Sequence, residues 1–344
     1  MHALVYHGPD DKRWEQVPDP KIIDDTDAIV RVDTATICGT DLHILHGDVP
    51  EVEPGRVLGH EAVGTVVETG VAVRAVRPGD HVLMSCISAC GACTFCRRGR
   101  YGQCRGGGGW LLGHLVDGVQ ADYVRVPFAD TSTYKVPEGV PDEYVLYLAD
   151  ILPTGYEVGV LNGRVSPADT VVVVGAGPIG LATVIGASLF SPREIVVVEP
   201  SDGRREWAVR FGAQRAVSPT EARSAVSDLT KGVGADVAIE AVGVPETFDL
   251  CTELVRPGGR VANVGVHGRP ALLHLETLWI RDVTITTGLV DTFSIPTLLA
   301  LIEVGRIDPV RFTTHRFRLA DALDAHDTFA RAAETNAIKV ALVA

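Results

Sequence analysis

The sequence has no long apolar run. A membrane-spanning helix needs about 18 consecutive apolar residues, and no stretch of the 344-residue chain approaches that length. Positive charge is also scarce, because 31 Lys and Arg face 44 Asp and Glu and leave a formal net charge of -13. Nucleic-acid binding depends on clusters of Lys and Arg that displace counterions from the phosphate backbone. We therefore expect neither a membrane nor a nucleic acid as a partner.

The first residues do not have the composition expected of a targeting segment. The chain begins Met-His-Ala-Leu-Val-Tyr, which alternates like a strand and has no basic stretch followed by an apolar core. A cytoplasmic location is the default expectation. The contents of 46% hydrophobic and 22% charged residues are those of an ordinary globular protein. The length suits two domains of roughly 100–200 residues each.

Two kinds of periodicity divide the chain. Up to about residue 150, short alternating runs such as 28–32 and 62–67 are separated by turn signals such as 77–80, which predicts a β-rich barrel with long loops. Farther along, buried strands alternate with amphipathic helices, as in βαβ units on a parallel sheet. The elements predicted there are strands at 171–174, 194–199, 235–240 and 260–266 and helices at 178–190 and 203–212. The tail, with a helix at 295–304 and β-like runs at 313–318 and 337–343, is expected to return to the first domain.

A glycine-rich turn, Gly175-Ala176-Gly177-Pro178-Ile179-Gly180, joins the first of these strands to a helix. Gly175 permits a tight turn, Gly177 lets a pyrophosphate approach the backbone, and Gly180 lets the helix pack closely on the strand. Pro178 and Ile179 begin the helix, whose free N–H groups and dipole favour negative charge. The pattern by itself is weak evidence, but its place between a strand and a helix predicts a dinucleotide site.

An acid follows at the distance expected for such a site. Glu199 ends the next strand, where a carboxylate can hold a ribose 2′-hydroxyl and would repel a 2′-phosphate. We therefore expect NAD(H) rather than NADP(H) as the cofactor. Arg204 is expected at the cofactor site, but together with Arg205 it could also accept a 2′-phosphate. The alternative for Glu199 is a solvated strand end without a role.

The seven cysteines are unevenly distributed. Cys90, Cys93, Cys96 and Cys104 form a CxxCxxCx7C cluster in a lobe at about residues 86–108. Four thiolates at this spacing can close a tetrahedron around zinc and leave no position for water, so the predicted site is structural. The arginines expected to offset part of its negative charge are Arg97, Arg98, Arg100 and Arg105. Two disulfides or an iron–sulfur cluster are the alternatives.

Two further patches offer ligands for a catalytic zinc, which needs about three protein ligands and an open position. Cys38 begins the patch Cys-Gly-Thr-Asp-Leu-His, and His60 lies within Gly-His-Glu. These residues supply a thiolate and an imidazole. A third, anionic ligand must come from elsewhere in the chain.

The order of these motifs resembles that of the zinc-containing medium-chain dehydrogenases, over essentially the whole chain. The resemblance implies an α/β fold, in which a Rossmann domain with a doubly wound parallel sheet (154–289) is inserted into a β-rich GroES-like barrel (1–153 and 290–344). The barrel domain would carry the catalytic residues and the zinc lobe. The resemblance also implies two zinc ions per subunit, and a homotetramer or a dimer by similarity to bacterial members.

In this family the third ligand of the catalytic zinc comes just before a Thr-Gly pair at the domain junction, and Asp150 falls on that position. Many members carry Cys or Glu there, whereas an Asp is similar to the bacterial secondary-alcohol dehydrogenases. Cys38, His60 and Asp150 would then hold the zinc, and the thiolate and the carboxylate would neutralise it. Glu61 is expected beside the metal as a supporting group or occasional ligand. Its alternative is a buried acid paired with an arginine.

Thr40 and His43 match the family's proton relay, in which the hydroxyl passes the proton of the bound alcohol through the cofactor ribose to the imidazole and on to water. His43 could instead be a surface histidine. Trp110 resembles the Trp that lines the substrate pocket in the secondary-alcohol branch, and packing under the zinc lobe is its alternative. His46 and His114 are assigned no role.

The resemblance favours a zinc-dependent, NAD(H)-linked alcohol dehydrogenase that acts reversibly on small, secondary alcohols by hydride transfer. The Cys-Gly-Thr-Asp-Leu-His patch is also similar to the threonine and polyol branches. Threonine, polyols and formaldehyde are therefore alternative substrates. A zinc protein that binds NAD without turnover is the alternative from a different class.

Overall fold

The computed structural model describes residues Met1–Ala344 and divides into two compact units. Unit 1 comprises Met1–Asp150 and Asp291–Ala344, and unit 2 comprises Ile151–Val290. Unit 2 is thus inserted into the sequence of unit 1. The boundaries differ slightly from the predicted ones, which were 153/154 and 289/290. No helix combines the length and the apolar content that a membrane span requires.

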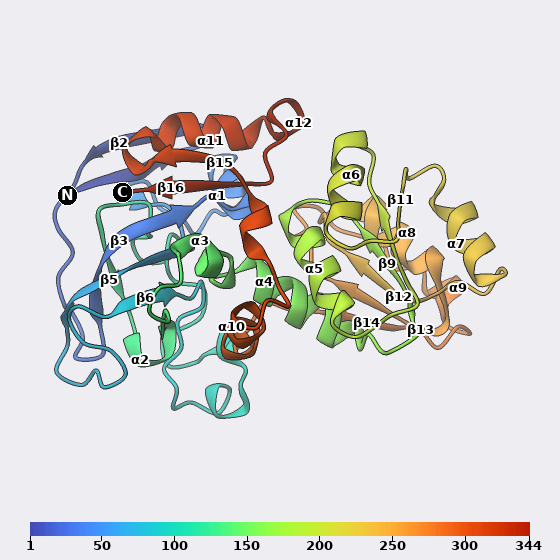
Figure 1. Cartoon of the computed structure of the whole chain (residues 1–344), viewed down its shortest axis with the longest axis horizontal. Helices are drawn as coiled ribbons and strands as arrows, with labels where there is room; N and C mark the ends of the chain where they lie inside the picture. The colour runs from blue at the N-terminus through green and yellow to red at the C-terminus, as the bar shows by residue number, and fades with distance from the viewer. The chain divides into compact units, whose positions relative to one another are not determined.

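Unit 2 is built on a parallel six-stranded sheet with the order β11-β10-β9-β12-β13-β14 (Figure 1). Its strands are β9 Thr170–Val174, β10 Glu194–Val198, β11 Arg215–Val217, β12 Ala235–Glu240, β13 Val255–Asn263 and β14 Thr284–Thr287. Numbered within the unit, the order is 3-2-1-4-5-6, which is that of a doubly wound dinucleotide-binding sheet. Every residue of β9 is buried, as expected for a central parallel strand covered on both faces. The predicted Rossmann fold is confirmed.

The helices of unit 2 precede the sheet or lie between its strands in the sequence. They are α4 Ile151–Thr154, the π-helix η4 Gly155–Leu161, α5 Pro178–Ser188, α6 Asp202–Arg210, α7 Ala222–Thr230, α8 Pro245–Leu254 and α9 Leu275–Leu278. The strand predicted at 260–266 is β13, which begins at Val255 and ends at Asn263, and the helix predicted at 178–190 ends at Ser188. Ala235 pairs with Val255 and Val237 pairs with Arg260, so a bulge accommodates the Pro-Gly-Gly segment at 257–259 within the strand.

Unit 1 is rich in β-structure, as predicted. A seven-stranded sheet has the order β15-β16-β3-β5-β6-β8, with β7 paired to β3, and a smaller sheet has the order β2-β1-β4. The strands are β1 His2–Gly8, β2 Asp11–Gln16, β3 Ala28–Thr36, β4 Arg56–Val57, β5 Ala62–Thr69, β6 His81–Met84, β7 Tyr123–Val126, β8 Thr133–Lys135, β15 Thr313–Arg318 and β16 Lys339–Val343. Its helices are α1 Gly39–Leu45, η1 Cys96–Arg98, η2 Tyr101–Gln103, α2 Ala129–Ser132, α3 Asp142–Val145, η3 Leu146–Leu148, α10 Ile295–Glu303, η5 Pro309–Phe312, η6 Leu319–Asp321, α11 Ala322–Ala330 and α12 Ala332–Thr335.

The C-terminal tail completes unit 1. β16 lies antiparallel to β3 and parallel to β15 (Figure 1), so the last residues of the chain pair with a strand from near its beginning. The sequence did not predict α11, although its buried residues Ala322, Ala325, His326 and Phe329 follow the helical spacing. Three of these residues join the strands in the main hydrophobic core of the unit.

Candidate active site and zinc centres

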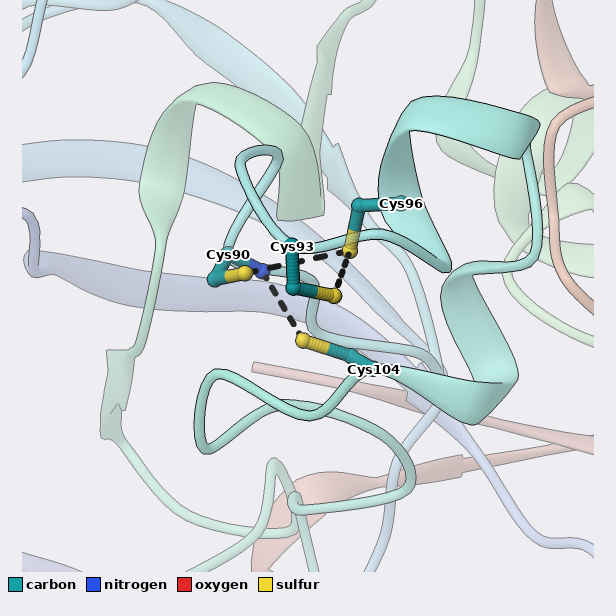
Figure 2. A group of neighbouring side chains, drawn as sticks. All are labelled: Cys90, Cys93, Cys96 and Cys104. Carbon is teal, nitrogen blue, oxygen red and sulfur yellow. Dashed lines mark hydrogen bonds between the residues drawn. The ribbon is translucent and has the colours of Figure 1, made fainter.

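Four cysteine thiols meet in the lobe between β6 and β7. Cys93 Sγ lies 3.5 Å and Cys90 Sγ 3.9 Å from Cys96 Sγ. All four sulfur atoms lie within 4.8 Å of one another, and Figure 2 shows them pointing toward a common centre. Zinc–sulfur bonds of about 2.3 Å would place sulfur atoms about 3.8 Å apart in a tetrahedron, so this donor set fits zinc. A Cβ at Gly106 would collide with Cys90 Sγ, which explains a glycine at that position.

The thiols are free rather than paired in disulfides, and backbone groups make two of them acidic. The N–H groups of Cys96 and Arg105 lower the pKa of the Cys93 thiol to about 6. Burial opposes ionisation of Cys104, but backbone N–H donors outweigh it and lower the pKa of this thiol too. These thiols are therefore prepared to act as thiolate ligands.

Two of the lobe arginines have partners other than sulfur. Arg100 Nη1 lies 3.6 Å from Asp291 Oδ2, and the Arg105 guanidinium lies over the Phe95 ring at 5.6 Å from its centroid. The backbone N–H of Arg105, in contrast, donates to Cys93 Sγ at 3.4 Å. Cys104 Sγ likewise accepts from backbone N–H groups, those of Cys90 and Gly106.

A second cluster in unit 1 brings together Cys38, His60, Glu61 and Asp150, whose ligand atoms also lie within 4.8 Å of one another. Asp150 Oδ2 lies 3.6 Å from Cys38 Sγ and 3.4 Å from His60 Nε2. All four residues are at least nine-tenths buried. Glu61 Oε2 is buried without a hydrogen-bond partner, as expected for an oxygen that faces a cation. A thiol, an imidazole and carboxylates form a donor set that suits zinc.

A buried lysine contributes positive charge to this cluster. Lys339 Nζ is fully buried and donates to Glu61 Oε1 at 2.6 Å and to the Ile37 carbonyl oxygen at 2.8 Å. Burial opposes the charge of Lys339, but the negative charges of Glu61 and Cys38 raise its pKa. The partner of Glu61 is therefore a lysine, not the arginine that was considered from the sequence.

The cluster has more acidic groups than one lysine can balance. Burial raises the pKa of the Cys38 thiol, and the nearby Glu61 carboxylate adds to the effect. Burial also raises the pKa of Glu61, while Lys339 opposes that shift. One ammonium cannot neutralise a thiolate and two carboxylates away from water, so the donor set as a whole fits a divalent cation.

Residues outside the predicted set hold the ligand segments in place. Cys38 N donates to Asp41 Oδ2 at 2.9 Å, and Gln120 Nε2 donates to the same oxygen at 3.2 Å. Asp41 lies in the first turn of α1, where the helix dipole favours an acid. Gly59 precedes His60 with φ +92, and a Cβ there would lie 2.6 Å from Gln120 Cγ. Gln120 thus supports both ligand segments, and no local sequence pattern indicated this role.

The predicted relay residues lie three residues apart on α1 and so share one face of the helix. Thr40 Oγ1 lies 3.6 Å from Cys38 Sγ, next to the cluster. His43 is 43% exposed, and its Nδ1 lies 2.9 Å from Asp48 Oδ2. Thr40 therefore borders the cluster of Cys38, His60, Glu61 and Asp150, and His43 reaches solvent.

Trp110 lies beside the same cluster. Its ring meets the His60 ring edge-on, with centroids 6.3 Å apart and an interplanar angle of 77°, and it stacks on His114 at 4.1 Å. It also packs against the main core of unit 1, so its two proposed roles are compatible. Cys86 is a further neighbour, with Sγ 3.7 Å from Asp150 Oδ1.

In unit 2 the glycine-rich turn lies at the carboxyl end of β9, where the strand order reverses. Gly175 has φ +104, and a Cβ there would lie 2.6 Å from Val242 Cγ2. A Cβ at Gly180 would collide with the Gly175 carbonyl oxygen. Gly177 is the N-cap of α5 with open space around its Cα, and Pro178 occupies the first turn of the helix. The turn therefore leaves the helix N-terminus open to an anion.

Glu199 directly follows β10 and is only 5% exposed. Its carboxylate accepts hydrogen bonds from Ala176 N at 2.9 Å and from Ser201 N at 3.0 Å. It thus bridges the glycine-rich turn and the start of α6, and it is not a solvated strand end.

The two arginines at the start of α6 differ. Arg205 donates to the carbonyl oxygens of Glu199 and Pro200, both at 2.7 Å, and pairs with Asp202. Arg204 donates its backbone N–H to Ser201 Oγ. Arg205 is therefore already engaged with the segment that leads into its own helix and with the first residue of that helix.

Comparison with known proteins identifies both parts of the chain. The model of the alcohol dehydrogenase GroES-like domain matches residues 24–138, and the model of the zinc-binding dehydrogenases matches residues 178–303. An alcohol dehydrogenase of Cupriavidus necator is 35% identical over 96% of this chain and 95% of its own length. Zinc-type alcohol dehydrogenase B of Aspergillus flavus is 38% identical over 78% of this chain, and the match spans 64% of that relative.

A solved structure has the same fold. The apo form of zinc-dependent alcohol dehydrogenase 2 from Streptococcus pneumonia superposes with a TM-score of 0.96 at 45% identity, over 100% of this chain and 98% of that one. On these matches, and with the motifs in their expected places, the chain belongs to the zinc-dependent medium-chain alcohol dehydrogenase family.

Proposed function

We propose that this protein is a zinc- and NAD(H)-dependent oxidoreductase that interconverts small, mainly secondary alcohols with ketones or aldehydes. The observation that carries the proposal is the convergence of Cys38, His60 and Asp150 at one buried point, with Thr40 at its edge. Three protein ligands are typical of a catalytic zinc, which keeps a position open for substrate. A thiolate, a carboxylate and a neutral imidazole would together neutralise the ion.

The chain's own residues would bind the metal and move the proton. Zinc held by this set would supply Lewis-acid polarisation of the substrate oxygen, and nicotinamide would supply the hydride acceptor. The Thr40 hydroxyl accepts the proton that leaves the alcohol and passes its own proton onward. His43, which is partly exposed, takes up that proton and releases it to solvent. Lys339 holds Glu61 by its Oε1 atom, which favours a supporting role for this acid.

A second zinc in the four-cysteine lobe would be structural. Four sulfur donors within 4.8 Å leave no position for water. An iron–sulfur cluster in the same donor set would give visible absorbance, whereas zinc gives none. The absorption spectrum of the purified protein therefore separates these two occupants.

NAD(H) is the proposed cofactor on the strength of Glu199. Its carboxylate lies at the end of β10 and is anchored to the glycine-rich turn, where it would accept from the ribose hydroxyls and repel a 2′-phosphate. Arg205 is engaged with backbone carbonyl groups and Asp202, which weakens the case for a 2′-phosphate site. The Kd values for NADH and NADPH test this preference directly.

Trp110 supports small aliphatic substrates, because its bulky ring lies against the His60 ligand.

A homotetramer or a dimer is proposed on a different observation. Unit 2 exposes Leu272, Leu275, Trp279 and Ile280 in the segment that precedes the edge strand β14, and exposed apolar patches often mark protein interfaces. Light scattering would determine the oligomeric state. The cytoplasmic location stays an expectation from the sequence.

The experiment that tests the proposed function combines metal analysis with turnover. Zinc per subunit and NAD-dependent oxidation of 2-butanol are measured for the wild type, Asp150→Ala and the control Asp324→Ala, which changes an exposed acid on α11. We expect two zinc ions in the wild type and the control. We expect one zinc ion and no turnover in Asp150→Ala, because only the catalytic site loses a ligand.

Other outcomes would contradict parts of the proposal. One zinc ion in the wild type, or full activity in Asp150→Ala, would contradict the third ligand. Faster turnover of threonine, sorbitol or formaldehyde than of 2-propanol and 2-butanol would move the protein to another branch of the family. Tight NADH binding without turnover of any alcohol or carbonyl compound would favour a binding protein.

A further inference from the structure

The segment after α1 places a carboxylate against the relay histidine. The helix ends at Leu45, and Gly47 follows with φ +81. Gly47 N donates to the Ile44 carbonyl oxygen and Asp48 N donates to the His43 carbonyl oxygen, both at 2.9 Å. These two bonds define a Schellman turn, in which a left-handed glycine brings the chain back over the last helical turn. The turn sets Asp48 Oδ2 2.9 Å from His43 Nδ1.

We propose that Asp48 is a positioning residue of the proton relay, which holds the Nδ1–H of His43 and leaves Nε2 as the nitrogen that exchanges protons. This inference rests on the relay in the proposed function. An ionised carboxylate can only accept hydrogen bonds, so the contact places a proton on Nδ1. In the neutral ring the other nitrogen is then the acceptor. Asp48 is the carboxylate within hydrogen-bond distance of His43 Nδ1.

The proton balance of the step is simple. During alcohol oxidation, Thr40 takes the proton from the substrate oxygen as its own proton moves on, and one N–H bond forms at His43 Nε2. The ring becomes an imidazolium whose positive charge faces the Asp48 carboxylate. Loss of the Nε2 proton to water restores the neutral ring, and Nδ1–H stays directed at Asp48 throughout. The hydride of the same oxidation goes to the nicotinamide of the proposed function.

The exposure of the pair separates this role from a structural one. The His43 and Asp48 side chains are 43% and 47% exposed. Exposed ion pairs contribute little to folding stability because water and salt screen them. Removal of the carboxylate should therefore slow turnover while leaving the unfolding midpoint and the zinc content nearly unchanged.

The test uses the zinc-loaded, full-length enzyme with NAD and 2-butanol. Asp48→Asn is expected to lower kcat about tenfold, a part of the roughly 10²–10⁴ that a positioned proton-transfer group contributes. The KM for 2-butanol should change by less than about twofold, and the solvent deuterium isotope effect on kcat should rise as proton transfer becomes slower. Asp48→Glu should retain most of the activity. The matched control is Glu276→Gln, which removes the carboxylate 2.7 Å from Nδ1 of the surface residue His274 in unit 2 and should leave kcat unchanged.

A double-mutant cycle with His43→Gln decides whether Asp48 acts through the histidine. His43→Gln should slow turnover, and Asp48→Asn should cause no further loss in that background. Wild-type kcat in Asp48→Asn, or the same loss in both backgrounds, would overturn the inference while the dehydrogenase function stands. Full activity in His43→Gln would overturn the relay and the inference with it. Absence of turnover in the wild type would instead overturn the proposed function.

Discussion

Replacement of Lys339 by methionine would test how the buried charge beside the catalytic cluster is balanced. Lys339 is 0% exposed, and its Nζ lies 2.6 Å from Glu61 Oε1 and 2.8 Å from the Ile37 carbonyl oxygen. Methionine fills a similar volume but cannot donate or carry charge, so Glu61 would lose its protein cation and Ile37 its donor. Removing one partner of a buried ion pair costs about 3–5 kcal/mol. At about 2–4 °C per kcal/mol, the unfolding midpoint should fall by roughly 6–20 °C.

The loss of stability should also depend on pH. Burial already raises the pKa of Glu61 above its ordinary value of 4.5, and Lys339 opposes that shift, so the variant should raise this pKa further. A carboxyl whose pKa is raised in the folded protein binds its proton more tightly there than in the unfolded chain. Its contribution to stability is therefore fully present below about pH 4.5 and is lost as the pH rises through the folded-state pKa. The difference between the variant and the wild type should therefore be larger at pH 8 than at pH 5, close to the lower limit of this range.

Urea unfolding of the zinc-loaded protein at both pH values provides the measurement, with zinc content checked for each sample. The set comprises the wild type, Lys339→Met, Glu61→Gln and the double variant. The double variant should recover much of the stability, because it no longer buries an unpaired carboxylate. If the double variant is as unstable as Lys339→Met, and neither depends on pH, the loss comes from packing and the charge argument is refuted.

Three further predictions concern the cofactor site and a buried histidine. Gly180→Ala places a Cβ against the Gly175 carbonyl oxygen, so fluorescence titration should show at least about tenfold weaker NADH binding with zinc content unchanged; equal affinity would contradict the close packing. Glu199→Gln should narrow the ratio of the NADH and NADPH Kd values by about tenfold, or about 1.4 kcal/mol; an unchanged ratio would mean that another residue selects the cofactor. Burial lowers the pKa of His326 from 6.5 to about 4. The contribution of the neutral ring to the free energy of unfolding is therefore fully present above pH 6.5 and is lost as the pH falls toward 4, a change of about 3 kcal/mol. His326→Gln, which can still donate to Gln120 Oε1, should show a flatter loss of stability over that range by urea unfolding, and an unchanged slope would assign the acid sensitivity to other groups.

Local patterns determined much of the fold. The β-branched run at 171–174 predicted a buried strand, and β9 spans Thr170–Val174 with every residue buried, because a central parallel strand needs apolar side chains on both faces. The helix predicted at 295–304 is α10 Ile295–Glu303. The start of β13 was missed, because a bulge can only be recognised once the neighbouring strand is known.

The two candidate metal sites also differ in how far the sequence could predict them. The four cysteines lie within one short lobe, so their spacing alone predicted that the sulfur atoms could meet. Cys38, His60 and Asp150 come from separate segments, and the third ligand was assigned through the family resemblance rather than from spacing. The structure places their candidate ligand atoms within 4.8 Å of one another.

The sequence by itself therefore determined the alternation of strands and helices around the glycine-rich turn, the turn itself and the local four-cysteine cluster, because each depends on residues close together in the chain. Only the tertiary structure decided which residues support the candidate catalytic cluster. Lys339 reaches Glu61 across 278 residues of sequence, and Gln120 reaches Asp41 across 79. The sequence could not predict these contacts, because the neighbour of a buried charge depends on which strand pairs beside it and in which register.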